Sequence, residues 1–398
     1  NAPAQRLRRR NADLPRRLRR LILTMPTALS LAERELLRAR AEAARDLLYL
    51  CLGRAERQFG DEPGKLHWIE GPPPEIILKW DEASATQVVY LYSQIALAFS
   101  GDARAFIRAV RGGGSGQGDD GSSLRVATLD IGGGTTDLVI TALRADGQGS
   151  NVTIFPRQLF RESFSLAGDD IVQLLAREVV VTALSRTVEQ SIGRERAEAL
   201  TQELFGGNRG DMSAEEQLRR QQFAMQIAAP VAVALLGEYE GYDPIDPPPV
   251  EIRKIGAFFR PDAPPPPGLV QSLERTVAEA GAADFRLMEV PIPVDLVDVD
   301  RIVRSLTGDM VRALAEVVWH YRADVMLLSG RPSRFPAIKD SILETGAHAP
   351  GPVGAEPLGE VECGGEAGGA RADDEDVGGE LHAASRPAAV RLRNTSSR

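Results

Sequence analysis

The run Asp130-Ile-Gly-Gly-Gly-Thr-Thr-Asp137 contains the residues of this chain that are best suited by type and spacing to chemistry. Consecutive glycines permit backbone conformations and close approaches that side chains would block. Backbone N–H groups in such a turn can converge on one oxyanion, and threonine hydroxyls add donors. The carboxylates of Asp130 and Asp137 are the ligand type that hydrated Mg2+ prefers. The run therefore predicts a site for the terminal phosphates of a nucleotide and its metal ion.

The predicted phosphate-binding residues of this run are Gly132, Gly133, Gly134, Thr135 and Thr136, and the predicted metal ligands are Asp130 and Asp137. The alternative is an ordinary hairpin with a glycine-rich turn. A bare glycine triplet would be weak evidence for a nucleotide site. The complete pattern, with acids and threonines between two strands, favours the nucleotide site.

Two strands must position this run. Apolar residues predict a strand at 124–131 and another at 137–143, with the glycines turning between them. Residues 145–147 (Ala-Asp-Gly) have the chemistry of a tight turn, and this predicts a third strand at 152–155. Gly168-Asp169-Asp170 is expected to open a helix that runs toward Leu184, where Asp169 is either a ligand or simply a helix cap.

The segments before this hairpin read as a strand, a helix, a second strand and a second helix. The strand at 21–25 is stopped by Pro26, and Ser30 with Glu33 forms a capping box for a helix over 31–52. A strand over 75–79 is followed by the segment 81–86 and then by a helix with apolar residues at Val88, Val89, Leu91 and Ile95.

After the hairpin, residues 191–237 look helical and residues 250–255 form a short strand between two proline clusters. A helix at 309–322 precedes a strand at 324–328. The loop at 329–334 (Ser-Gly-Arg-Pro-Ser-Arg) then leads into a helix at Phe335. This loop is either a nucleotide-binding turn or a plain connection with solvated arginines.

Composition and charge exclude several classes of protein. The chain has 398 residues, of which 43% are hydrophobic and 26% charged, as in folded globular proteins. No apolar run approaches the roughly 20 residues of a membrane-spanning helix. A formal charge of -9 disfavours broad binding of nucleic acid, and the arginine-rich stretch at 6–20 is interpreted as a solvated segment rather than a nucleic-acid or membrane arm. Two cysteines support no disulfide framework, so we expect a cytoplasmic protein, with secretion or delivery to a host left open.

The run Asp130 to Asp137 resembles the second phosphate motif of the actin-like ATPase superfamily, which includes actin, sugar kinases and DnaK-type chaperones. Asp81-Glu82-Ala resembles a chaperone segment, which implies a role for Glu82 near Mg2+ and the attacking water. Gly168 and Asp169 resemble the element that begins the next helix. The stretch from Val325 to Pro336 resembles the adenosine motif, and this implies that Ser329, Gly330, Arg331 and Arg334 contact the nucleotide.

More narrowly, the chain resembles the SrfB family of bacterial virulence-associated proteins. The residues that carry this resemblance lie in the stretches 16–24, 81–83, 86–92, 130–137 and 327–334. The resemblance implies an α/β chain with the actin-like ATPase fold, in which two ribonuclease-H-like units enclose ATP. The first phosphate motif of the superfamily, Asp-x-Gly-Thr, does not occur before Leu21. We therefore expect a fragment whose first unit is truncated at its N-terminus.

On this reading the chain divides into six parts. These are a partial first subdomain (1–111), a flexible loop (112–123), the first segment of the second subdomain (124–190), an inserted mostly helical subdomain (191–290), a return segment with the adenosine-type motif (291–344) and a low-complexity tail expected to be disordered (345–398).

The expected function is ATP binding with Mg2+, with possible hydrolysis, and closure of the cleft around the nucleotide to change the binding of an unidentified protein partner. The candidate catalytic residues are Asp130, Glu82 and Asp137. One alternative is a scaffold or assembly protein that binds nucleotide without hydrolysing it. A small-molecule kinase of the same superfamily ranks third, because no acceptor-sugar motif is visible.

Overall fold

The computed structural model describes residues 18–27, 29–57, 66–69, 71–111, 123–148, 151–206, 212–348 and 388–391. The chain divides into two units, Asn1–Val89 and Tyr90–Arg398. The arginine-rich segment before residue 18, residues 112–122 of the loop predicted over 112–123, and most of the predicted tail lie outside the described residues. The six subdomain boundaries expected from the sequence stay a prediction.

The first unit pairs β1 (Arg20–Met25) in parallel with β4 (Glu75–Asp81), and α2 (Leu31–Cys51) packs beside them. The short strands β2 (Ala55–Arg57) and β3 (Leu66–Trp68) form a separate antiparallel pair. The predicted capping box of α2 is confirmed, because the Ser30 hydroxyl accepts from the Glu33 N–H and the Glu33 carboxylate accepts from the Ser30 N–H. β4 runs past the predicted end at residue 79 to Asp81, and α3 (Glu82–Tyr92) follows immediately.

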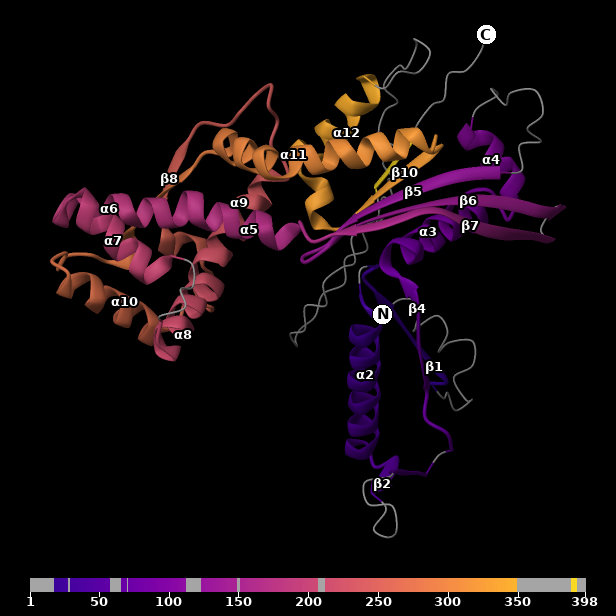
Figure 1. The fold of residues 1–398 in the computed structure, drawn as a ribbon, viewed down its shortest axis with the longest axis horizontal. Helices are drawn as coiled ribbons and strands as arrows, with labels where there is room; N and C mark the ends of the chain where they lie inside the picture. The colour runs from indigo at the N-terminus through magenta and orange to yellow at the C-terminus, as the bar shows by residue number, and fades with distance from the viewer. Residues whose placement is uncertain are drawn as a thin grey trace, which may run out of the picture. The chain divides into compact units, whose positions relative to one another are not determined.

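The second unit is built on a five-stranded sheet in the order β11-β10-β5-β6-β7 (Figure 1). Its consecutive strands β5, β6 and β7 are antiparallel, whereas β10 returns parallel to β5. The strands are β5 (Ser123–Ile131), β6 (Thr136–Gln148), β7 (Asn151–Phe164), β10 (Val325–Ser329) and β11 (Ala388–Arg391). The predicted strands on both sides of the glycine turn are thus confirmed.

The two faces of this sheet have different coverings. Side chains that alternate along β5, such as Leu129 and Ile131, pack into a large core with helices α5 (Gly168–Leu175), α9 (Ala229–Tyr239), α11 (Leu296–His320) and α12 (Pro336–His348). Leu124 and Val126 point to the opposite face and pack against α4 (Ala103–Arg111). Alternation of side chains along a strand produces this division, since neighbouring residues point to opposite faces.

A mostly helical segment follows α5 and returns to the sheet through α11, which Figure 1 shows lying along the strands. Its remaining elements are α6 (Thr182–Ile192), α7 (Arg194–Phe205), α8 (Ala214–Phe223), α10 (Pro267–Glu279) and the antiparallel pair β8 (Glu251–Lys254) and β9 (Pro291–Val294). The helical character predicted for 191–237 and the strand predicted near 250–255 are confirmed. No helix in the described part of the chain is both long enough and apolar enough to span a membrane.

Three sequence predictions for the second unit are wrong. Residues 145–147 do not turn, because Asp146 pairs with Thr153 and Gly147 with Val152 inside the ladder of β6 and β7. β7 also extends to Phe164, well beyond the predicted end at 155, since its long partner β6 continues to satisfy its backbone groups. The helix predicted from 309 begins at Leu296 instead, capped by the Asp295 carboxylate, which accepts from the N–H groups of Val297 and Asp298.

Part of the predicted tail is also structured. α12 continues to His348, and residues 388–391 form β11, antiparallel to β10. Without β11, β10 would be an edge strand with unpaired N–H and C=O groups along one side, and β11 satisfies them.

Candidate functional site

A row of polar residues crosses four adjacent strands at one end of the sheet of the second unit. Ser329 of β10 pairs in register with Asp130 of β5, Asp130 pairs with Asp137 of β6, and Asp137 pairs with Ser163 of β7. Residues in register on neighbouring strands project from the same face. Two carboxylates and two hydroxyls therefore share one face, next to the glycine turn.

Three hydroxyl groups near this row are buried without a partner. Among the described residues, the Oγ atoms of Ser163 and Ser329 and the Oγ1 atom of Thr128 have no hydrogen-bond partner. Thr128 is fully buried and lies two residues before Asp130, so its side chain points to the same face. Buried polar groups are normally hydrogen-bonded, and an unsatisfied one costs about 1–3 kcal/mol. These unsatisfied hydroxyls therefore lower the stability of the fold at this end of the sheet.

The two carboxylates of the row lie in the same largely buried surroundings as these hydroxyls. Asp137 is buried, and the Thr135 hydroxyl donates to its Oδ2 atom over 3.3 Å. Burial raises the pKa of Asp130 above its ordinary value, and the nearby charge of Asp137 adds to the rise. The Ser329 hydroxyl faces Asp130 and opposes the rise, although the two groups lack the geometry of a full hydrogen bond. An anionic Asp130 is therefore disfavoured where the fold places it.

The glycine turn is fixed to the start of α5 by backbone hydrogen bonds. The N–H of Gly168 donates to the carbonyl of Gly132 over 2.9 Å, and the N–H of Asp169 donates to the carbonyl of Gly133 over 2.8 Å. A Cβ atom on Gly133 would lie 3.3 Å from Oδ1 of Asp169, so that carboxylate faces the turn. The backbone N–H groups of Gly168 and Asp169 thus support the turn, and a ligand role for these two residues stays a prediction.

Gly330 brings the loop after β10 against the same turn. Its φ of +82° is favourable only for glycine, and an added Cβ would overlap the carbonyl oxygen of Ile131 and lie 3.2 Å from Oδ1 of Asp130. Ser333 closes the loop, because its N–H and its hydroxyl both donate to the carbonyl of Gly330, over 3.3 and 2.7 Å. The two glycine-bearing loops that the sequence singled out are therefore in direct contact.

The two arginines of this loop are held by an acid that the sequence did not single out. Arg331 Nε donates to Oε1 of Glu240 over 2.5 Å, and Arg334 Nη1 lies 3.7 Å from Oε2 of the same carboxylate. A Cβ on Gly237 would lie 3.4 Å from Arg331 Nη2, so this guanidinium lies along the last turn of α9. Glu240 is 91 residues from Arg331, and no local pattern could have predicted the pair.

The structure thus brings most of the predicted site residues together at one end of the sheet. They are Asp130, Gly132, Gly133, Gly134, Thr135, Thr136, Asp137, Gly168, Asp169, Ser329 and Gly330. Arg331 and Arg334 belong to the same loop but contact α9. Glu82 lies in the first unit, so its predicted role stays a prediction. No group of three or more potential metal ligands occurs among the residues that the structure describes.

The fold and the site define a mixed α/β protein whose sheet ends in a glycine hairpin between two aspartates. The sequence matches the family model described as virulence factor SrfB over residues 1–352. The chain therefore belongs to the SrfB family. A comparison with curated proteins gives no match.

Proposed function

We propose that the second unit is part of an actin-like ATPase domain, which binds ATP with Mg2+ at the glycine hairpin. The observation that carries this proposal is the alignment of Ser329, Asp130 and Asp137 on three adjacent strands, with Gly330 packed against the turn that joins two of them.

The residues present fit a polyphosphate and a divalent cation. Asp130 and Asp137 are neighbouring carboxylates in a largely buried place, and the raised pKa of Asp130 reflects the cost of that arrangement. A cation between them would remove this cost. Magnesium commonly takes one or two carboxylates together with water and phosphate oxygens, so a third acidic ligand is not needed. The unpaired hydroxyls of Ser163, Ser329 and Thr128 are available as further polar partners or as contacts for ordered water.

The chain supplies positioning and charge for phosphoryl chemistry. When bound, the metal ion neutralises charge on the phosphates and polarises them. Asp130 and Asp137 would hold it, and the backbone N–H groups of the glycine turn would serve as donors to phosphate oxygens. The hydrogen bonds from Gly168 and Asp169 keep the turn rigid, which limits the reorganisation required on binding. Within the second unit, Asp130 is the candidate for orienting an attacking water.

Calorimetric titration with Mg-ATP, together with thermal unfolding, tests the proposal. A ligand at about 100 times its dissociation constant stabilises the fold by about 2.7 kcal/mol, so Mg-ATP should raise the melting temperature. Asp130→Ala should abolish the rise. Asp146→Ala is the matched control, because this exposed acid lies at the other end of β6. Equal loss in both variants, or no binding by the unmodified chain, would refute the proposal.

Phosphate release measured under the same conditions decides between the enzyme and the scaffold. Release that is lost in Asp130→Ala identifies an ATPase. Saturable binding without release identifies a nucleotide-gated scaffold. Formation of ADP only in the presence of a hydroxyl acceptor would instead identify a kinase.

A further inference from the structure

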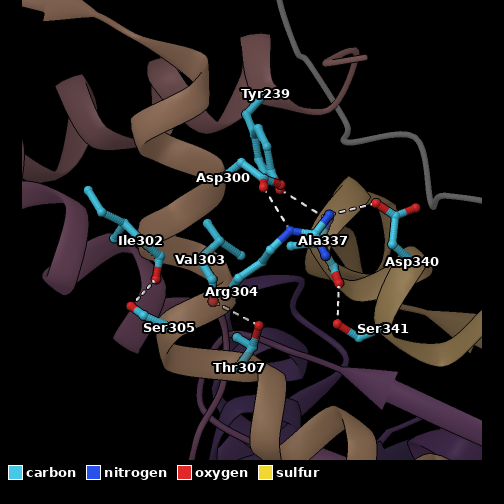
Figure 2. Close-up of polar contacts among 10 residues, drawn as sticks. All are labelled: Tyr239, Asp300, Ile302, Val303, Arg304, Ser305, Thr307, Ala337, Asp340 and Ser341. Atoms are coloured by element: carbon cyan, nitrogen blue, oxygen red, sulfur yellow. Dashed lines mark hydrogen bonds and ion pairs between the residues drawn. The ribbon is translucent and has the colours of Figure 1, made fainter. Parts of the chain in front are cut away.

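Two consecutive residues at the end of α9, Tyr239 and Glu240, hold the two segments that follow β10. Glu240 binds Arg331 and Arg334 of the loop, as described above. The Tyr239 hydroxyl donates to Oδ1 of Asp300 over 2.5 Å and accepts from the N–H of Ala337 over 3.0 Å. Figure 2 shows this hydroxyl between α9, α11 and the start of α12.

The contact with Ala337 satisfies a helix end. Ala337 is the second residue of α12, so its N–H has no acceptor within that helix. Pro336 before it has no N–H at all. The Tyr239 side chain therefore acts as the cap of α12 from a distance of 98 residues in sequence. Because α12 begins directly after the loop, fixing its first turn also fixes the end of the loop.

A partly buried network holds the Tyr239 hydroxyl in place. Arg304 donates to Oδ2 of Asp300 over 2.7 Å and to Oδ2 of Asp340 over 2.6 Å, so it connects α11 with α12 (Figure 2). Burial, and then the hydrogen bond to Asp300, raise the pKa of Tyr239 far above its ordinary value. The phenol consequently remains neutral and able to donate throughout the physiological range.

The position of Glu240 is not explained by the stability of α9. It directly follows the last residue of the helix, where the negative end of the dipole disfavours a carboxylate. The Glu240 side chain is only 21% exposed, and the contacts that compensate it come from the two loop arginines. The ion pairs with the loop arginines, one of them 91 residues away, explain why Glu240 carries a charge at this unfavourable helix end.

We propose that Tyr239 and Glu240 are positioning residues that keep residues 330–335 against the glycine hairpin. Glu240 restrains the loop through its arginines, and Tyr239 restrains it through the first turn of α12. Their effect on ligand binding rests on the proposed function, whereas their effect on the loop does not.

Hydrogen exchange of the unliganded chain tests the hold on the loop directly. Glu240→Gln and Tyr239→Phe should each speed the exchange of backbone amides in 330–338 by about tenfold, as expected for the loss of one charged or buried hydrogen bond. Glu238→Gln is the matched control. Glu238 lies on the same helix turn but pairs with Arg253 of β8, so this variant should affect the amides near 251–254 instead.

Affinity for Mg-ATP provides the second readout. Glu240→Gln should weaken binding by about tenfold, whereas Glu238→Gln should leave it unchanged, although each variant removes a carboxylate that pairs with arginine at the end of α9. The positioning role would be overturned if exchange at 330–338 were unchanged in Glu240→Gln and Tyr239→Phe, or increased equally in Glu238→Gln. Tighter binding of Mg-ATP by Glu240→Gln would also overturn it. Absence of Mg-ATP binding in the unmodified chain would refute the proposed function, and the exchange comparison would still decide whether these residues hold the loop.

Discussion

Gly330 lies directly against the carbonyl group of Ile131, so that a Cβ atom at position 330 would be 2.6 Å from the Ile131 carbonyl carbon. This contact joins the loop after β10 to the turn after β5, two segments separated by about 200 residues. It also requires a φ of +82°, which residues with a side chain rarely adopt. Space and backbone conformation thus both demand glycine at this position.

Replacing Gly330 by alanine should therefore destabilise the fold. The collision and the unfavourable φ act together, and we expect a loss of more than about 2 kcal/mol in the free energy of unfolding. Urea denaturation measures this loss. Gly308→Ala is the control, because position 308 lies inside α11 with open space around it and should gain up to about 1 kcal/mol from helix propensity. A tolerated Gly330→Ala would show that the loop does not lie on the hairpin.

Asp130→Asn should raise the melting temperature near pH 7 while removing affinity for Mg-ATP. The folded-state pKa of Asp130 lies above its unfolded value, so its favourable contribution exists at low pH and is lost as the pH rises through the folded pKa. At neutral pH the carboxylate costs stability, and the neutral amide removes that cost. The gain should shrink as the pH approaches about 4, the ordinary pKa of aspartate.

Thermal unfolding between pH 4 and pH 7 in the presence of a chelator checks this prediction. The chelator is needed because a bound cation would stabilise the charged form of Asp130. A melting temperature for Asp130→Asn below that of the unmodified chain at every pH would contradict the predicted cost of the carboxylate.

Arg304→Ala should lower the free energy of unfolding more than most substitutions of partly exposed residues. It removes the cation between Asp300 and Asp340 and leaves both carboxylates partly buried without that partner. Loss of one member of a buried ionic group costs about 3–5 kcal/mol, and the partial exposure of Arg304 reduces the expectation to about 2 kcal/mol.

Arg301→Ala is the control for this change. Arg301 occupies the same helix and pairs with Asp298 at an exposed site, so its loss should cost less than about 1 kcal/mol. Equal effects of the two substitutions in chemical denaturation would show that the network of Figure 2 adds nothing beyond an ordinary surface pair.

Stability should decline at alkaline pH in a manner that depends on Tyr239. Its folded-state pKa is raised, so its contribution is complete below the unfolded pKa of about 10 and is lost as the pH rises toward the folded value. Tyr239→Phe should be less stable near pH 8, because it loses the hydrogen bonds that the hydroxyl makes with Asp300 and with the Ala337 N–H. The free energy of unfolding of this variant should nevertheless fall less steeply between pH 10 and pH 11. Urea denaturation across that range provides the measurement, and parallel slopes would argue against a buried neutral phenol.

Local patterns predicted much of the second unit. The strands on both sides of the glycine turn, the helix that begins at Gly168, and the strand and loop at 325–334 follow from apolar runs, turn residues and helix signals that act over a few positions. The capping box at Ser30 is of the same kind, since its two hydrogen bonds join residues three apart. The family resemblance also came from such short motifs, and the match to the SrfB family model confirms it.

The turn predicted at residues 145–147 was wrong, because a neighbouring strand supplied hydrogen-bond partners for the backbone there. Asp146 and Gly147 have the residue types of a turn, yet both remain in the ladder because β7 continues beside them. The extent of a strand depends on whether its partner continues to satisfy its N–H and C=O groups, and that is a property of the pair rather than of either sequence.

By itself, then, the sequence determined the glycine hairpin, its flanking acids and the glycine loop after β10, because these are local arrangements of residue type. Only the tertiary structure decided that Ser329, Asp130 and Asp137 stand in register, that Gly330 touches Ile131, and that Tyr239 and Glu240 hold the loop. These relationships join residues far apart in the chain, and they arise from the packing of a shared core and the registration of β10 on β5. No pattern within a window of a few residues contains that information.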